Sequence, residues 1–364
     1  MDFTFSEEQV ALRDVARQAL ERAIDPVKLR ELADGDTGFD DELWHALVEL
    51  GWSGLLIPEE FGGSGAGLLE MCIVLEEMGR VPLPGPFFSS ALYATLAARS
   101  LGAVDLLAGL ASGVSRGAVA LQEMGYGNPL ETVRTRARRK GARWVLSGLK
   151  PLVLDAHSAD WVIVVARSEE GVRSFLIEHP TAEVVPTLDP TRKAARMVLE
   201  DEPAIPIGPS GDQAALWRRV LDDVCVALAS ETVGVADRAL SEAVEYSKVR
   251  VVFDRPIASF QAVKHRIVDM FHALEMARVG AQFAAWASDT DAPERERACA
   301  MAASYASEAG VRVTGDDIQI HGGVGFTWDN DAHFLFKRAK QNEVLIGGVS
   351  HERRRLARML VESA

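Results

Sequence analysis

The sequence predicts a multidomain α+β protein: an N-terminal helical domain, then a central antiparallel β-domain, then a C-terminal four-helix bundle. Apolar residues at helical spacing fill the first third of the chain, and longer repeats of the same spacing fill the last third. Short β-rich runs bounded by Gly, Asp or Pro fill the middle. We place the three domains at residues 1–116, 117–211 and 212–364.

The N-terminal domain opens on a helix-capping pattern. Ser6 occupies the N-cap and Gln9 follows three residues later, which makes a capping box. Apolar residues then recur at helical spacing. Further helices are expected over residues 41–50, 68–78 and 89–100, because Gly- and Pro-rich segments separate these stretches.

The pattern changes from helical to strand-like near Gly117. Residues 131–137 alternate between the two faces of an expected strand. Further short β-rich runs follow at residues 143–146, 161–166, 173–177 and 197–199. Several such runs at close spacing predict a compact antiparallel β-domain.

An arginine cluster lies in and just after the first of these runs. It comprises Arg134, Arg136, Arg138 and Arg139. These side chains could reach a phosphorylated ligand such as coenzyme A. A solvated sheet face is the favoured interpretation, because charged residues are usually exposed.

Helical spacing returns after the Gly208–Gly211 linker. Four long helices are expected over residues 216–246, 263–277, 301–313 and 345–360. Helices of this length with one apolar face each pack together as a bundle.

Composition and charge exclude several classes of function. The chain is 48% hydrophobic and 25% charged, which is typical of a globular protein. Its net charge of −14 repels phosphate backbones, so we expect no nucleic-acid partner. Cys72, Cys225 and Cys299 are far apart and predict neither a disulfide framework nor a metal site. No signal peptide or membrane-length apolar segment is present, so we expect a cytoplasmic protein without a membrane partner.

Three local motifs occur in order along almost the full length of the chain. They are LGWSGLLIPEEFGG at 50–63, YSKVRVVFDRPIASFQ at 246–261, continuing to Asp269 and Met270, and QIHGGVG at 319–325. Together these motifs resemble those of the flavin-dependent acyl-CoA dehydrogenases, whose fold has the same helical, β and helical-bundle layout. The resemblance implies FAD as cofactor, an acyl-CoA substrate, and an electron-transfer flavoprotein or similar acceptor.

The resemblance also implies which residues bind FAD. In the family, the residues at Arg250 and Phe253 contact the FAD of a neighbouring subunit, and Gln261 bonds to it from the next helix. The planar fork of an arginine suits a pyrophosphate. The resemblance implies that the opposite wall of the FAD site is formed by Gln319, Gly322 and Gly323, where glycines let the backbone approach the dinucleotide.

Two residues within these motifs call for separate interpretation. Asp254 stands where the family usually has Gly, and a carboxylate near a pyrophosphate is mildly unfavourable. His321 lies inside the glycine turn. We interpret it as a packed, structurally bonded histidine, because the family's chemistry needs no imidazole there.

The catalytic base of the family is missing. The reaction needs a carboxylate that takes a proton from the substrate Cα. The resemblance places Ile346 at the usual base position and Val224 at the position that a minority of relatives use, and neither side chain accepts a proton. Asp223 points about 100° away around its helix, and Glu231 lies about 10 Å further along the axis. These two carboxylates are the remaining candidates.

The expected flavin cradle of the β-domain is also incomplete. The family uses a Thr-Glu turn and a later Trp-x-Thr strand. Residues 121–125 are a weak version of the first, and Leu152 and Leu154 replace the Trp and the Thr. A leucine cannot donate a hydrogen bond to a flavin.

This combination resembles the base-lacking subunit of actinobacterial α2β2 steroid-CoA dehydrogenases. We therefore expect a subunit of a heteromeric acyl-CoA dehydrogenase, which contributes the trans half of the FAD site to a homologous base-carrying subunit. A steroid side-chain CoA ester is the substrate that this resemblance suggests. One alternative is a self-sufficient homotetramer that uses Glu231 or Asp223 as base, and another is a flavin-free scaffold. A flavin monooxygenase would need no base, but the incomplete cradle argues against it.

Overall fold

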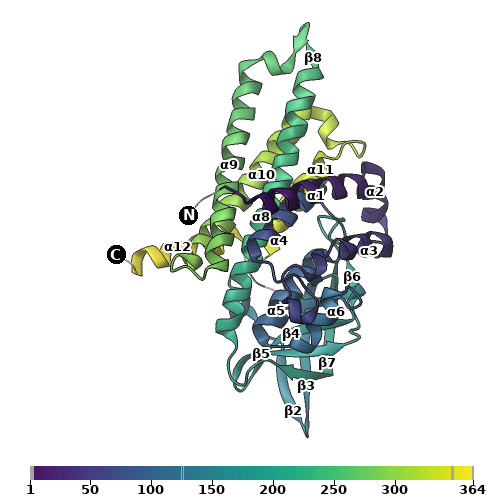
Figure 1. Cartoon of the computed structure of the whole chain (residues 1–364), viewed down its shortest axis with the longest axis vertical. Helices are drawn as coiled ribbons and strands as arrows, with labels where there is room; N and C mark the ends of the chain where they lie inside the picture. The colour runs from purple at the N-terminus through teal and green to yellow at the C-terminus, as the bar shows by residue number, and fades with distance from the viewer. Residues whose placement is uncertain (1–3, 124, 126, 346–347, 363–364) are drawn as a thin grey trace. The chain divides into compact units, whose positions relative to one another are not determined.

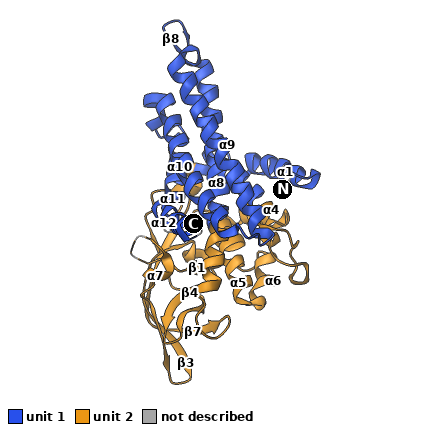
Figure 2. Ribbon diagram, turned by 90° about the vertical axis from the view of Figure 1, so that its left-hand side faces the viewer, with its two compact units in different colours: residues 1–29, 72–83, 225–364 blue, residues 30–71, 84–224 orange. Residues whose placement is uncertain are grey.

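The computed structural model of the chain describes residues 4–123, 125, 127–345 and 348–362. As the sequence predicts, helices occupy the first and last thirds and a β region lies between them (Figure 1). The chain packs into two compact units (Figure 2). Unit 1 comprises Met1–Leu29, Cys72–Leu83 and Cys225–Ala364, and unit 2 comprises Arg30–Met71 and Pro84–Val224. The two compact units therefore differ from the three domains expected from the sequence, and the boundaries of those domains stay a prediction.

The first third is helical. Its helices are α1 (Glu7–Ala23), α2 (Pro26–Asp34), α3 (Asp41–Glu49), α4 (Leu68–Arg80), α5 (Thr95–Leu101) and α6 (Leu107–Ala111), with a π-helical segment over Phe87–Ala94. The predicted capping box is confirmed. The Gln9 backbone N–H donates to the Ser6 hydroxyl at 3.2 Å, and the Ser6 N–H donates to the Gln9 side chain at 3.0 Å.

The middle region forms one sheet that closes on itself. Its strands are β1 (Gly117–Ala120), β2 (Arg136–Lys140), β3 (Arg143–Leu154), β4 (Trp161–Ser168), β5 (Gly171–Glu178), β6 (Glu183–Val185) and β7 (Ala194–Ile207). The pairing runs β4-β2-β3-β7-β5 and returns to β4, while β1 adds to β4 in parallel and β6 adds to β7. Apolar side chains such as Val162, Val164 and Phe175 fill the interior.

The predicted strand over residues 131–137 is wrong in its first half. Residues Pro129–Thr132 form a short helix, α7, and β2 begins only at Arg136. The Asn128 side chain accepts a hydrogen bond from the Leu130 N–H at 3.0 Å, and proline occupies the first helical position. Cap and proline together favour a helical turn, and they outweigh the alternating pattern.

The last third contains α8 (Ala214–Val249), α9 (Gln261–Asp289), α10 (Arg295–His321), α11 (Ala332–Leu345) and α12 (Val349–Glu362), with a hairpin of β8 (Val251–Val252) and β9 (Arg255–Pro256) between α8 and α9. The sequence predicts α8, α9, α10 and α12 but misses α11. The buried face of α11 includes Arg338, Gln341 and Asn342, so its apolar period is interrupted. No described helix is long and apolar enough to cross a membrane.

Within unit 1, α4 and α8 touch backbone to backbone. A Cβ atom on Gly79 would lie 2.1 Å from the carbonyl oxygen of Glu231. A Cβ atom on Gly234 would lie 1.7 Å from the carbonyl oxygen of Glu76. Only glycine permits so close a crossing, and this contact fixes the position of α8, which carries several of the candidate site residues.

Candidate functional site

The first group of predicted cofactor residues lies where α8 turns back into α9 (Figure 1). Arg250 follows the last residue of α8, and its backbone N–H donates to the carbonyl oxygen of Tyr246 at 2.9 Å. Phe253 and Asp254 form the two-residue turn between β8 and β9, with φ of 55° and 59°. Phe253 is 85% exposed, so the hairpin presents an aromatic ring to solvent.

The backbone explains the departure at Asp254. Two consecutive left-handed residues are what a tight two-residue hairpin requires, and glycine adopts this conformation at least cost. Aspartate is one of the few other residues that tolerate the left-handed region. Asp254 therefore keeps the hairpin closed and adds an exposed carboxylate at its tip.

The polar members of the predicted FAD site are all exposed. Gln261 is the first residue of α9, and Gln319 lies in the last turn of α10. Among the residues that the structure describes, the side chains of Arg250, Gln261 and Gln319 have no hydrogen-bonding partner. A guanidinium and two amides without internal partners fit the oxygen-rich pyrophosphate and ribityl part of a flavin nucleotide.

The glycine turn after α10 has three glycines with different roles. Gly322 has φ of 64°, which favours glycine where α10 ends. Gly325 is required by packing, because its Cβ atom would lie 3.0 Å from the carbonyl oxygen of Ile318. Cβ atoms on Gly322 and Gly323 would meet nothing within 4 Å, so that side of the turn is open to a ligand.

His321 joins the two groups of residues. Its ring stacks on that of Tyr246 with centroids 4.4 Å apart, which links α10 to the end of α8. Its Nδ1 lies 3.0 Å from the carbonyl oxygen of Asp317 and 3.0 Å from the Asp317 carboxylate. The prediction of a packed, structurally bonded histidine is confirmed. Burial lowers the pKa of His321, but the hydrogen bond and charge of Asp317 outweigh burial and raise the pKa above its usual value.

The two positions that the sequence motifs predict for the base are Val224 and Ile346. Val224 is fully buried on α8, and Asp223 beside it is half-buried. Ile346 lies outside the described residues. Their identities alone make Val224 and Ile346 unable to accept a proton.

Glu231, the other candidate base, is held in a buried ion pair. The guanidinium of Arg338 donates from Nη1 to Glu231 Oε1 at 2.7 Å, and Asn342 Nδ2 donates to Oε2 at 2.9 Å. Glu231 is 2% exposed and Arg338 is 0% exposed. Arg338 also donates to the carbonyl oxygens of Pro82 and Leu83 at 3.2 and 3.1 Å. The arrangement fastens α11 to α8 and to the segment after α4.

The expected flavin cradle of the β-domain contains a second buried pair. Lys150 is 0% exposed and donates to Glu123 at 2.6 Å and to the carbonyl oxygens of Leu121 and Val165 at 3.1 and 2.7 Å. Glu123 accepts in turn from the N–H groups of residues 134 and 135. Burial lowers the pKa of Lys150 to about 8, against the opposing charge of Glu123. Glu123 thus links the backbone at residues 134 and 135 to Lys150 on β3.

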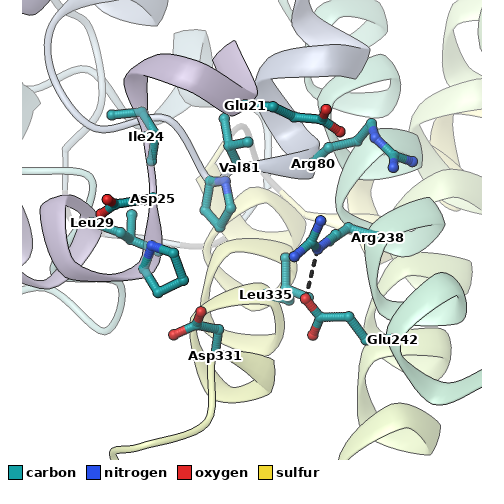
Figure 3. Close-up of a pocket in the computed structure, with 12 residues that line it drawn as sticks. Glu21, Ile24, Asp25, Leu29, Arg80, Val81, Arg238, Glu242, Asp331 and Leu335 are labelled. Atoms are coloured by element: carbon teal, nitrogen blue, oxygen red, sulfur yellow. Dashed lines mark hydrogen bonds and ion pairs between the residues drawn. The ribbon is translucent and has the colours of Figure 1, made fainter. Parts of the chain in front are cut away.

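A pocket of about 390 Å³ also lies in unit 1, and none of the predicted site residues lines it (Figure 3). Four acids and two arginines surround an apolar floor. Arg238 donates to Glu242 at 2.6 Å, and Arg80 pairs with Asp237. Burial raises the pKa of Glu242, and the nearby charge of Arg238 opposes this rise. Both arginines of the pocket are therefore already in ion pairs with acids of the protein.

Sequence reasoning missed Arg338, Asn342 and Lys150 as partners of the buried carboxylates. A signal was present for α11, where Leu335, Arg338, Asn342 and Leu345 recur at helical spacing, with two polar residues between two leucines. Polar residues at core positions of a helix point to a buried partner.

Comparison with known proteins covers almost the whole chain. Residues 6–101 match the family model "Acyl-CoA dehydrogenase, N-terminal domain", and residues 215–361 match "Acyl-CoA dehydrogenase, C-terminal domain". The acyl-CoA dehydrogenase IpdE2 of Mycolicibacterium smegmatis is 33% identical over 96% of this chain and 98% of its own. The IpdE2 protein of Mycobacterium tuberculosis is 34% identical over 98% of each chain.

Solved structures give the same result. The steroid acyl-CoA dehydrogenase variant Tcur3481-Tcur3483 superimposes with a TM-score of 0.89 at 31% identity, over 98% of both chains. The ChsE4-ChsE5 complex of Mycobacterium tuberculosis superimposes with a TM-score of 0.90 at 30% identity, over 100% of this chain and 99% of that chain.

Proposed function

Because the chain belongs to the acyl-CoA dehydrogenase family, we propose that it is a subunit of a heteromeric FAD-dependent acyl-CoA dehydrogenase. Enzymes of this family oxidise a CH–CH bond of an acyl-CoA thioester. In the proposed complex this chain contributes the trans half of the FAD site, and a homologous partner subunit contributes the base. Electrons leave to an electron-transfer flavoprotein or a similar acceptor.

The residues of this chain bind and orient the cofactor. Bound FAD supplies the acceptor for the hydride that leaves the substrate Cβ. Arg250 would pair with the pyrophosphate of FAD, while Gln261 and Gln319 would donate to other oxygens of the nucleotide. The open side of Gly322 and Gly323 leaves room for the dinucleotide backbone.

One observation carries the proposal: Glu231, a candidate base on α8, is already in a buried ion pair. Arg338 and Asn342 occupy both carboxylate oxygens of Glu231. A carboxylate paired with a buried guanidinium is a poor proton acceptor, because protonation would leave the arginine charge uncompensated. Glu231 therefore stabilises the fold. Because Asp223 points away from Val224 around its helix, we assign the base to another chain.

An exposed apolar surface in unit 1 supports assembly with a second subunit. On α9, Val268, Phe271, Met276 and Val279 are 61%, 55%, 52% and 49% exposed and lie at nearly helical spacing. His272 and Glu275 lie between them on the same face, and apolar side chains grouped in this way on an exposed face often mark a protein–protein contact. Together with the exposed Phe253 ring, it is a surface that a homologous chain would cover.

The similar proteins of known structure suggest the partner and the substrate class. One is a complex of two differently named chains, and another is called a steroid acyl-CoA dehydrogenase. By analogy, we propose an α2β2 assembly and a steroid side-chain CoA ester as substrate.

The proposal is tested by expressing the chain alone and with a base-carrying homologue. We expect the chain alone to purify with little FAD and without activity on acyl-CoA thioesters. We expect the co-expressed complex to be yellow, with half as many flavins as subunits. A fully flavinated, active oligomer of this chain alone would instead identify a self-sufficient homotetramer. A complex without flavin at its unlike interfaces would identify a scaffold.

A further inference from the structure

The arginine cluster of the β-domain lines a hollow that the proposed function does not use. β2 pairs with β4 at one position only, Arg136 with Arg167, and the two strands then separate. The space between them is a pocket of about 840 Å³. The antiparallel pair of β2 and β3 beside it lies at the bottom of Figure 1. Ligand pockets for small molecules are typically about 300–1,000 Å³.

The charge of this pocket is opposite to that of the chain. Five arginines and two glutamates line it, although the net charge of the chain is −14. The arginines are Arg134, Arg136, Arg138, Arg139 and Arg167. A cationic hollow on an acidic protein concentrates anions locally.

Part of this charge is already compensated. Arg138 donates to both carboxylate oxygens of Asp201 at 2.7 and 2.8 Å. Arg167 donates to the carbonyl oxygens of Val133 and Leu130 at 2.9 and 3.0 Å, so it holds the chain between α7 and β2 in place. These two arginines build the pocket.

The glutamates at the opposite wall are on the turn between β4 and β5. Glu170 accepts from Arg173 at 2.8 Å and from the Gly211 N–H at 3.1 Å, so it is engaged outside the pocket. Glu169 is exposed. An acidic peptide that continued past the pocket would meet these carboxylates, whereas a compact anion would not.

Arg134 and Arg136 are available to a ligand. Both are exposed, and among the described residues neither guanidinium has a hydrogen-bonding or ionic partner. Thr135 between them is buried, so the two arginines lie on the same side of an extended segment, about 7 Å apart along it. Arg139 lines the same pocket from the other face of β2, with its guanidinium 5.0 Å from the centre of the Trp144 ring.

We propose that this pocket binds a soluble oligophosphate, with Arg134 and Arg136 as its principal ligands and Arg139 as a third cation. Two planar guanidiniums at this spacing match adjacent phosphate groups, each bound through two parallel N–H···O bonds. Free pyrophosphate and the phosphates of a nucleotide share this chemistry. Binding requires neither flavin nor a partner subunit, so its test is independent of the proposed function.

The test is isothermal titration of the full-length chain with inorganic pyrophosphate at low ionic strength. We expect saturable binding that weakens as salt increases. The variant Arg134→Gln/Arg136→Gln should weaken binding by about tenfold or more, because each lost charge-assisted hydrogen bond is worth roughly that factor. The matched control is Arg143→Gln/Arg218→Gln, which removes the same charge from exposed positions outside the pocket and should stay within about twofold of the parent.

Titration with 3′,5′-ADP and with vesicles containing phosphatidylglycerol separates the sources of the phosphate. Binding of 3′,5′-ADP with the same dependence on Arg134 and Arg136 supports the proposal. Preferential binding to the vesicles would overturn it in favour of a membrane surface, and tighter binding of hexaglutamate than of pyrophosphate would overturn it in favour of a protein partner. Equal pyrophosphate binding by the parent and the Arg134→Gln/Arg136→Gln variant would also overturn it.

Discussion

Arg338 on α11 and Glu231 on α8 form an ion pair with 2.7 Å between Nη1 and Oε1, and both side chains are almost completely buried. The pair matters for function because it engages Glu231, one of the two carboxylates on α8 that are candidate bases. It matters for stability because Arg338 also bonds to two backbone carbonyl groups after α4. The same contact thus removes a candidate base and joins three segments of unit 1.

The first prediction concerns the stability that this pair provides. Glu231→Ala should lower the free energy of unfolding by about 3–5 kcal/mol, because it leaves the buried Arg338 charge uncompensated. Urea denaturation measures the change. The double variant Glu231→Leu/Arg338→Leu should lose less unfolding free energy than the sum of the losses in Glu231→Leu and Arg338→Leu, since neither charge then remains. Additive costs would mean that the two residues do not act as a pair.

The second prediction concerns the crossing of α4 and α8. Gly79→Ala and Gly234→Ala would each place a Cβ atom about 2 Å from a backbone oxygen of the facing helix, which cannot rotate away. Each change should destabilise the fold by about 1–3 kcal/mol or more.

Gly280→Ala on α9 is the matched control for these two changes. Its Cβ atom would meet nothing within 4 Å, and alanine is the better helix former by about 1 kcal/mol. Urea denaturation of the three variants should therefore give opposite signs. A neutral result at Gly79 and Gly234 would show that the helices can separate without cost.

The sequence predicted the order of helices and strands well because those signals are local. Helix caps, apolar periodicity and glycine turns are each written within a few residues, as at Ser6 and at the Gly322 turn. Partners in the core are not local. Lys150 is 27 residues from Glu123, and Arg338 is 107 residues from Glu231, so no periodicity relates them. The helix α11 was missed for the same reason, because its buried arginine is favourable only beside Glu231.

The candidate site divides in the same way. Arg250, Phe253 and the glycine turn could be predicted as site residues because they lie in short motifs, and the structure shows them exposed or open. The stacking of His321 on Tyr246 joins residues far apart in the chain, and only the structure shows it. The pocket between β2 and β4 arises where two strands stop pairing, which a pattern within one strand does not encode.

The third prediction concerns the pH dependence of stability at His321. Asp317 raises the pKa of His321 above the value it has in the unfolded chain. The folded state therefore binds the proton more tightly, and this contribution to stability is fully present below about pH 6.5 and is lost as pH rises through the folded pKa. The difference in unfolding free energy between the parent and His321→Asn should shrink over that interval. A difference that grows with pH would reverse the assigned sign.

The fourth prediction tests Arg250 as a cofactor ligand in the co-expressed complex. Arg250→Ala should weaken FAD retention by about ten- to a hundredfold, since a charge-assisted bond to phosphate is worth roughly 1.5–3 kcal/mol. Assembly should survive, because the Arg250 side chain has no hydrogen-bonding partner among the described residues.

Lys248→Ala is the control for this variant. It removes a nearby positive charge that already pairs with Glu245 at 2.6 Å, so flavin retention should stay near that of the parent. Flavin absorbance after gel filtration measures both variants. Full flavin retention by Arg250→Ala would favour the scaffold function.

The fifth prediction tests whether this chain supplies the base. In the co-expressed complex, Glu231→Gln and Asp223→Asn should leave turnover per flavin within a few-fold of the parent. Glutamine keeps an oxygen that can accept from Arg338 and is the milder change at that position, so the variant separates a catalytic from a structural role. A catalytic base contributes about 10²–10⁴-fold, which a few-fold change cannot imitate.

Stopped-flow reduction of the flavin by an acyl-CoA thioester gives the rate of the chemical step directly. A hundredfold loss at either residue with normal flavin content would place the base on this chain, and the partner subunit would then have another role.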